Sequence, residues 1–198
     1  MWAVIEGPDG TGKSSIIKEL QGRLDNVKPF YDPGISKEPE HEKWQDIRNF
    51  IKQQDMASDT ETLMFLSMRC ELVYYIEKAV KDGFIPLVDR YNISTHIYQG
   101  VLKGRTKLIE RLEEAVEFPK PDYTFVLSAP WEVVNERIEG RFKTMDANMD
   151  KFKASGDFRK RIWEEYDNYT RSHSGITKID VNRPLSEIAD EIERYISI

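Results

Sequence analysis

The segment Gly7–Ser14, GPDGTGKS, constrains the fold of this chain more than any other part of its sequence. It matches the pattern G-x-x-x-x-G-K-[ST] in full, with an apolar run at residues 2–5 before it and an amphipathic pattern at residues 16–24 after it. The glycines let the backbone curl so that several N–H groups point inward, and the following helix adds its positive end. The motif therefore predicts a strand, a loop that binds phosphate and a helix, in this order.

Such a loop suits the phosphates of a nucleoside di- or triphosphate. Lys13 is expected to reach the outer phosphates, and the hydroxyl of Ser14 is expected to ligate Mg²⁺. Asp89, at the end of the apolar run FIPLVD, suits the second acidic residue that holds the metal, usually through water. The loop alone does not separate a kinase from a GTPase or a mechanical ATPase. The nucleotide-binding residues predicted from it are Gly7, Pro8, Asp9, Gly10, Thr11, Gly12, Lys13, Ser14 and Ser15.

Strands and helices are predicted to alternate along the chain. The alternation indicates one domain over residues 1–198 with an α/β, three-layer P-loop NTPase fold, in which helices cover both faces of a parallel sheet. Ligands in such sheets collect beyond the carboxyl ends of the strands, where both the glycine loop and Asp89 lie. Pro86 cannot donate to a strand ladder, so a bulge or an unpaired amide is expected there. Strands are expected at 2–6 and within FIPLVDRY, PDYTFVLSAP and ITKIDV. A loop is expected at 29–40, with room for a short strand before it. Helices are expected after the glycine loop, at 41–53, within DTETLMFLSMRCELVYYIEKAVKDG, and at 105–117, 131–141, 157–171 and 184–196.

The composition limits the classes of partner. The chain carries a formal net charge of −6, which argues against a nucleic-acid track, because binding such a polyanion rests on a surplus of Lys and Arg. Small phosphate ligands need only a local concentration of positive charge. No apolar run approaches the length that spans a bilayer, and the chain starts on a predicted strand rather than a leader, so the expected location is the cytoplasm, without membrane contact. The single cysteine, Cys70, is expected to be a small buried side chain.

Two further motifs carry a family resemblance. The segment DRYNISTHIYQG, from Asp89 to Gly100, resembles the D-R-Y-x-x-S-x-x-A-Y-Q-G segment of thymidylate kinases, with His96 in place of the alanine. Phe65 and Arg69 match the F-x-x-x-R pair of the same family, and their four-residue spacing puts them on one helix face. The resemblance covers nearly the whole chain. It implies transfer of the γ-phosphate of ATP to dTMP, which gives dTDP and ADP, with Mg²⁺ as the cofactor.

The resemblance also implies how dTMP is held. Phe65 offers a stacking face to a pyrimidine, Arg69 can donate to a carbonyl on the base edge, and Gln99 would hydrogen-bond the same edge. Tyr98 would crowd the 2′ position of the sugar, and Arg90 would hold the acceptor phosphate. In the family, the acidic residue inside the phosphate loop lies near the 3′ hydroxyl of the acceptor and the transferring phosphate. The dTMP-binding set implied is Asp9, Lys37, Phe65, Arg69, Arg90, Ser94, Tyr98 and Gln99.

The segment before residue 42 has two possible matches. SKEPEH, from Ser36 to His41, resembles a weakened T-R-E-P-G-G segment of the family, with Lys37 where an arginine is usual. Lysine keeps the charge but loses the bidentate fork, so its contact with the acceptor phosphate would be looser. The earlier YDPGIS also resembles part of that segment, and this alignment leaves no basic residue at the position.

The region after the strand YTFVLSAP resembles the lid of the family. Arg137 and Arg141 reproduce its R-x-x-x-R step, which implies that both bind ATP, and the lid is expected at about 141–157. Members place a phosphate-contacting arginine either in the phosphate loop or in the lid, and the loop position here is Gly10. The extra charge is therefore expected from the lid, where the candidates are Arg141, Lys143, Lys151 and Lys153. The catalytic set implied is Asp9, Lys13, Asp89, Arg90 and Arg141.

Other functions keep the same phosphate loop. A broad deoxynucleoside monophosphate kinase would have a similar acceptor site with relaxed base contacts. A deoxynucleoside kinase would use Asp89 as a base near the 5′ hydroxyl of the sugar. A non-catalytic nucleotide-binding switch would lack an acceptor pocket. The acceptor-side residues Phe65, Arg69, Arg90 and Gln99 argue against this function. Related kinases are homodimers, so a homodimer is expected.

Overall fold

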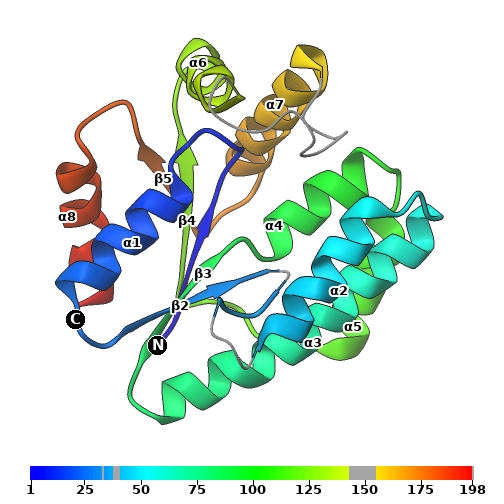
Figure 1. The fold of residues 1–198 in the computed structure, drawn as a ribbon, viewed down its shortest axis with the longest axis horizontal. Helices are drawn as coiled ribbons and strands as arrows, with labels where there is room; N and C mark the ends of the chain where they lie inside the picture. The colour runs from blue at the N-terminus through cyan, green and yellow to red at the C-terminus, as the bar shows by residue number, and fades with distance from the viewer. Residues whose placement is uncertain (33, 38–40, 143–154, 198) are drawn as a thin grey trace.

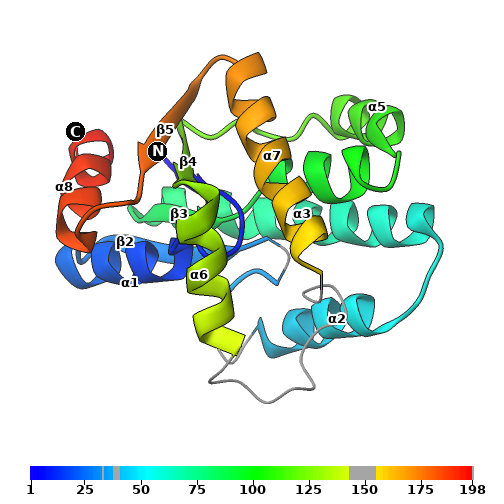
Figure 2. The same cartoon turned by 90° about the horizontal axis from the view of Figure 1, so that it is seen from above.

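The computed structural model describes residues 1–32, 34–37, 41–142 and 155–197 (Figure 1). Within them, five parallel strands form one sheet in the order β2-β3-β1-β4-β5. The strands are β1 (Ala3–Glu6), β2 (Val27–Tyr31), β3 (Ile85–Asp89), β4 (Tyr123–Ser128) and β5 (Ile176–Asp180). Helices lie on both faces of this sheet (Figures 1 and 2), which confirms the predicted α/β fold of the P-loop NTPase type.

Helices connect the strands, as parallel pairing requires. They are α1 (Lys13–Arg23), α2 (Glu42–Gln53), α3 (Ser58–Lys81), α4 (Asn92–Thr95), the π-helix η2 (His96–Val101), α5 (Thr106–Val116), α6 (Trp131–Phe142), α7 (Gly156–Ser172) and α8 (Leu185–Ile196). Among the described residues, no helix is both long and apolar enough to cross a bilayer.

Alternate residues of the central strand β1 face opposite layers of helices. Ala3 and Ile5 pack with apolar side chains of α1, α6 and α8, whereas Val4 packs on the other face with α3. Val126 of β4, on the same face as Val4, packs against α4, η2 and α7. All these strand residues are at most 2% exposed. The buried positions therefore follow the two-residue period of a strand that is covered on both faces.

The strand order makes β1 the central strand, and the connections that follow β1 and β3 lead to opposite sides of it, to β2 and to β4. β2 and β3 lie on one side of β1, and β4 and β5 lie on the other. Ile5 is in register with Asp89, so the loop that follows β1 begins beside the end of β3. Such a switch point is where open α/β sheets bind ligands.

Pro86 lies inside the sheet without a bulge in the register. The N–H of Ile85 donates to the carbonyl of Asn26 on the β2 side, at 2.8 Å. Because successive residues point to opposite neighbours, the nitrogen of Pro86 points toward β1. Pairing of β1 with β3 begins only at Ala3 and Leu87. The nitrogen of Pro86, which carries no hydrogen, therefore lies where β1 offers no partner for a ladder hydrogen bond. Of the two alternatives predicted for Pro86, the structure has the unpaired amide and not the bulge.

Three local expectations differ from the structure. Residues 29–31, expected to be loop, belong to β2, which begins at Val27. Cys70 is exposed rather than buried, because it lies on the outer side of α3. The segment after Asp89 forms α4 and then η2, neither of which the periodicity predicted.

Candidate active site

The loop between β1 and α1 has the backbone geometry that its glycines allow. Gly7, Gly10 and Gly12 have φ angles of 140°, 90° and 86°. A Cβ atom at Gly7 would lie 2.7 Å from the carbonyl oxygen of Leu127, so a larger residue cannot take this place without a shift of backbone. Thr11 Oγ1 donates to the carbonyl of Pro8 at 2.8 Å and closes the turn.

The side chain of Lys13 folds back onto this loop. Its Nζ donates to the carbonyl oxygens of Gly7 at 2.8 Å and Pro8 at 3.0 Å. Burial, and then the positive charge of Arg90, lower the pKa of Lys13 to about 8. The loop therefore holds a cation whose charge is costly and which an anion in the loop would stabilise.

Ser14 and Asp89 meet at the start of α1. Ser14 Oγ donates to Asp89 Oδ2 at 3.4 Å, while Oδ1 of Asp89 is buried without a hydrogen-bond partner among the described residues. A hydroxyl and a carboxylate are oxygen donors of the kind that Mg²⁺ prefers, and an unsatisfied buried carboxylate oxygen suits a cation or its water. These two residues therefore fit the predicted metal site.

Arg90 reaches from the end of β3 to the phosphate loop. Its φ angle is 72°, which few residues other than glycine adopt, and its N–H donates to the carbonyl of Ile5 at 3.0 Å. This backbone turns the side chain toward Asp9, whose Oδ1 accepts from Nη2 at 2.6 Å. Nη1 donates to Ser94 Oγ at 3.1 Å and to the hydroxyl of Tyr166 at 3.0 Å. Strained backbone of this kind persists where the surrounding contacts fix it.

Glu6 fixes those surroundings, although no sequence motif predicted a role for it. Its side chain is fully buried, and Oε1 accepts from the N–H groups of Tyr91 at 2.7 Å and Ser94 at 3.1 Å. Oε2 accepts from Ser94 Oγ at 2.6 Å and from the hydroxyl of Tyr166 at 3.0 Å. A buried carboxylate is tolerated only when such donors surround it. The available signal was a charged residue at the end of an apolar strand.

Two tyrosines, Tyr98 and Tyr166, also contact Arg90. Burial raises the pKa of Tyr98 to about 12, and its ring lies 5.5 Å from the guanidinium of Arg90. Burial and then the charge of Glu6 raise the pKa of Tyr166, which comes from α7 and was not predicted either. Both phenols therefore stay protonated at neutral pH, and the hydroxyl of Tyr166 donates to Glu6.

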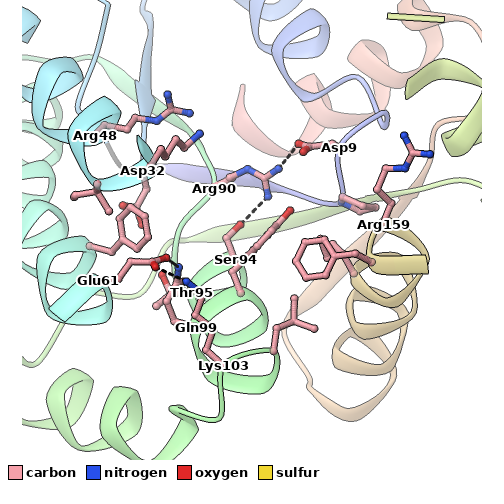
Figure 3. Close-up of a pocket in the computed structure, with 18 of the residues that line it drawn as sticks. Asp9, Asp32, Arg48, Glu61, Arg90, Ser94, Thr95, Gln99, Lys103 and Arg159 are labelled. Carbon is pink, nitrogen blue, oxygen red and sulfur yellow. Dashed lines mark hydrogen bonds and ion pairs between the residues drawn. The ribbon is translucent and has the colours of Figure 1, made fainter. Parts of the chain in front are cut away.

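A pocket of about 610 Å³ opens beside Arg90 (Figure 3). Eight of the predicted site residues line it, namely Pro8, Asp9, Phe65, Arg90, Ser94, Tyr98, Gln99 and Arg141. The wall also contains charged residues that were not predicted from the sequence, among them Asp32, Arg48, Lys52, Glu61, Lys103 and Arg159. They come from α2, α3 and α7 and from loops, and only the tertiary fold brings them together. Pro8 and Asp9 of the phosphate loop and the acceptor-side residues therefore line one cavity.

Arg69 lies behind the wall of this pocket. It is fully buried, with Nε donating to Asp32 at 2.8 Å and Nη1 to Glu113 at 2.9 Å. Nη2 donates to the carbonyl of Tyr91 at 3.0 Å and to the hydroxyl of Thr95. Asp32, Tyr91 and Thr95 line the pocket, whereas Arg69 is not among its described lining residues. The structure therefore places Arg69 as a support of the wall, and the implied contact with the base stays a prediction.

Other predicted residues lie away from the pocket. Lys37 is exposed, with Nζ 5.0 Å from the ring centre of Tyr31. Arg137 donates to the carbonyl of Val181, after β5, at 3.1 Å. Lys143, Lys151 and Lys153 lie outside the described residues, as does most of the predicted lid.

His96, where the family segment has alanine, contacts the neighbours of Arg69. Its Nε2 lies 2.8 Å from Oε2 of Glu113, whose other carboxylate oxygen accepts from Arg69. The side chain therefore extends the buried network of Arg69 toward α5.

The order of the sheet, the loop Gly7–Ser14 and the acidic residue at the end of β3 define a P-loop nucleotide-binding protein of the α/β class. A family model described as thymidylate kinase matches residues 5–192. The chain belongs to the thymidylate kinase family.

Three curated relatives carry this name. The thymidylate kinase of Mycoplasma mobile is 36% identical over 177 residues, which cover 84% of this chain and 81% of the relative. That of Cupriavidus necator is 30% identical over 198 residues, 97% of this chain and 95% of the relative. That of Dinoroseobacter shibae is 28% identical over 201 residues, 98% of this chain and 94% of the relative. The likeness therefore extends along nearly the full length of two of the relatives.

Proposed function

We propose that the protein transfers the γ-phosphate of ATP to dTMP and releases dTDP and ADP. The observation that carries this proposal is the 2.6 Å contact between Arg90 and Asp9, which joins the phosphate loop to a pocket lined by Phe65 and Gln99. A P-loop protein that only hydrolyses or senses a nucleotide does not need an acceptor pocket beside its phosphate loop. The family and the names of the relatives support dTMP as the acceptor.

On the donor side, ATP would lie with its β and γ phosphates in the loop Gly7–Ser14. Lys13 would contact the outer phosphates, and Ser14 and Asp89 would hold Mg²⁺. Arg137, whose side chain donates to the carbonyl of Val181 after β5, would lie toward the nucleoside end of ATP. Arg141 lines the shared pocket and would be a cation of the proposed lid. Mg²⁺, when bound, would supply positive charge to the phosphate oxygens.

On the acceptor side, the base of dTMP would stack on Phe65 and hydrogen-bond to Gln99. Tyr98 would lie against the sugar, and Arg90 and Ser94 would face the acceptor phosphate. A guanidinium binds phosphate through two parallel hydrogen bonds, so Arg90 would exchange its contact with Asp9 for the phosphate oxygens. Asp9 would then be available to the sugar 3′ hydroxyl.

The protein would accelerate the reaction mainly by position and charge. Phosphoryl transfer has a loose transition state, and the protein has little covalent chemistry to perform. Lys13 and Arg90 would neutralise charge on the oxygens of the transferring group, while the two sites hold donor and acceptor in line. Closure of the lid would exclude water that would otherwise hydrolyse ATP.

We also propose that the chain acts as one domain and as a homodimer, in the cytoplasm. All three clusters of buried apolar side chains include residues of the one sheet, which supports a single domain. The helices α2 and α3 expose Phe50, Leu63 and Tyr74, with 52%, 47% and 60% of their surface accessible. Apolar surface of this kind supports an interface between copies. Light scattering after size-exclusion chromatography would test the dimer, and a monomer at micromolar concentration would contradict it.

The test of the activity is ADP formation from ATP and Mg²⁺ with dTMP, dUMP, dCMP, dGMP, dAMP and thymidine supplied separately. Turnover with dTMP should dominate. Similar turnover with several monophosphates would indicate a broad deoxynucleoside monophosphate kinase, and turnover with thymidine alone would indicate a nucleoside kinase. ATP turnover that no acceptor changes would overturn the kinase proposal.

A further inference from the structure

Glu61 of α3 contacts two residues of the segment that follows β3, and we call these three residues the Glu61 cluster. Nε2 of Gln99 donates to Oε1 of Glu61 at 3.2 Å, and Nζ of Lys103 pairs with the second oxygen, Oε2. All three side chains line the pocket that Phe65 also lines, and Figure 3 shows them converging. The cluster therefore lies where the base of the acceptor is proposed to bind.

Glu61 fixes the donor end of the Gln99 amide. A carboxylate can only accept hydrogen bonds, whereas the glutamine amide carries a donor, Nε2, and an acceptor, Oε1. Glu61 therefore holds the NH₂ end of the amide and turns Oε1 away from itself. Lys103 offsets the charge of the partly buried carboxylate, whose side chain is 12% exposed.

The backbone of Gln99 is fixed as well. It lies in the π-helix η2, where the N–H of Leu102 donates to the carbonyl of Ile97, five residues earlier, at 3.0 Å. Gln99 is 6% exposed, so its side chain has little room to change rotamer. Single π turns of this kind are frequent at functional sites, because they aim side chains that an α-helix would place elsewhere. The amide is therefore held from both its backbone and its far end.

This orientation matters for the choice between pyrimidines. N3 of thymine carries a hydrogen and donates, whereas N3 of cytosine has a lone pair and accepts. On the basis of the proposed function, we propose that Glu61 is a positioning residue that presents Oε1 of Gln99 to the N3–H of thymine and thereby excludes cytosine. A cytosine at the same place would set a lone pair against Oε1 and leave both acceptors unpaired, which is the kind of mismatch that polar sites reject strongly.

Arg69 is the other side chain that could hydrogen-bond to the edge of the base. Its contacts favour Gln99 for this role. All three guanidinium nitrogens of Arg69 donate to protein groups behind the wall of the pocket. These contacts use four of the five N–H donors of Arg69, and two carboxylates hold the fully buried guanidinium, so a movement toward the base would weaken its ion pairs with Asp32 and Glu113. Gln99, which lines the pocket, is therefore better placed than Arg69 to contact N3 of the base.

The test is the variant Glu61→Gln, which keeps the shape of the side chain but can donate as well as accept. The amide of Gln99 can then turn, and we expect the ratio of kcat/KM for dTMP to that for dCMP to fall by at least about tenfold, with the KM for ATP unchanged. The matched control is Asp59→Asn, the same chemical change on the same helix, where Asp59 pairs with Arg105. If the loss of a charge on α3 acted only on the structure, kcat/KM would fall equally for dTMP and dCMP, and their ratio would stay unchanged.

A second variant keeps the proposal testable if Glu61→Gln folds poorly, as judged by circular dichroism. Gln99→Leu removes the acceptor itself and should lower the same ratio, and the double variant should lower it no further, because both changes act on one contact. An unchanged ratio in Glu61→Gln, or additive losses in the double variant, would overturn the role of Glu61. Wild-type protein that does not prefer dTMP would instead overturn the proposed function, before any variant is measured.

Discussion

The hydroxyl of Tyr166 donates to Oε2 of Glu6 at 3.0 Å and so joins α7 to the last residue of β1, directly before the phosphate loop. The same hydroxyl accepts from Nη1 of Arg90 at 3.0 Å. One oxygen atom therefore couples the helix that follows the proposed lid, the phosphate-loop strand and the proposed acceptor-phosphate site.

Tyr166→Phe should weaken this coupling without removing the ring from the core. We expect kcat/KM for dTMP to fall by about tenfold and the free energy of unfolding to fall by about 1–3 kcal/mol, because a buried carboxylate loses one donor. Urea unfolding and steady-state kinetics measure the two effects. The control is Tyr169→Phe, which also removes one hydroxyl from α7. Its ring, which stacks on His173 at 3.8 Å between centroids, stays in place. Equal effects of the two variants would contradict the role of the Tyr166 hydroxyl.

The pKa of Lys13, lowered to about 8 by burial, predicts a pH dependence of ATP binding. Phosphate binds the protonated amine, which predominates below pH 8, so above this value binding requires uptake of a proton. The Kd for ATP in the presence of Mg²⁺ should therefore rise with pH beyond about 8, by up to about tenfold per pH unit. Isothermal titration calorimetry between pH 6.5 and 9.5 measures it. The Lys13→Met variant should bind weakly at every pH, and a flat wild-type profile would refute the prediction.

Arg69→Met should act mainly on stability. Removal of one partner from a buried ion pair costs about 3–5 kcal/mol, because Asp32 stays buried without its cation. Urea unfolding measures this loss. Arg105→Met is the control, because Arg105 and Asp59 form an exposed pair, for which about 0–1 kcal/mol is expected. A stable Arg69→Met protein with a raised KM for dTMP alone would instead favour the contact with the base that the family resemblance implies.

Asp89→Asn tests the metal site at the end of β3. The variant keeps an oxygen but loses the charge that would hold Mg²⁺ or its water, so the Mg²⁺ concentration for half-maximal turnover should rise by about 10- to 100-fold. Titration of Mg²⁺ at saturating substrates measures the change. If Asp89 were a catalytic base instead, turnover would stay low at any Mg²⁺ concentration.

Much of the fold follows from local patterns. The glycine loop predicts its own strand and helix, and Asp89 lies at the predicted strand end because the apolar run before it spans β3. The side chains that hold Arg90 could not be predicted this way. Glu6 and Tyr166 are 160 residues apart and meet only when α7 packs on the sheet. The spacing of Phe65 and Arg69 correctly predicts one helix, but Asp32 and Glu113, which decide where Arg69 points, come from other elements.

The π-helix His96–Val101 also limits how the length of the chain can change. A π turn contains one residue more than an α turn, so the deletion of a single residue there would turn the segment into ordinary α-helix. Each residue of an α-helix advances by about 100°, and the side chains on one side of the deletion would rotate by that amount relative to the other. Gln99 would leave the wall that Tyr98 and Glu61 share. Homologous chains that differ in length by one residue in this segment are therefore expected to differ in the base they accept.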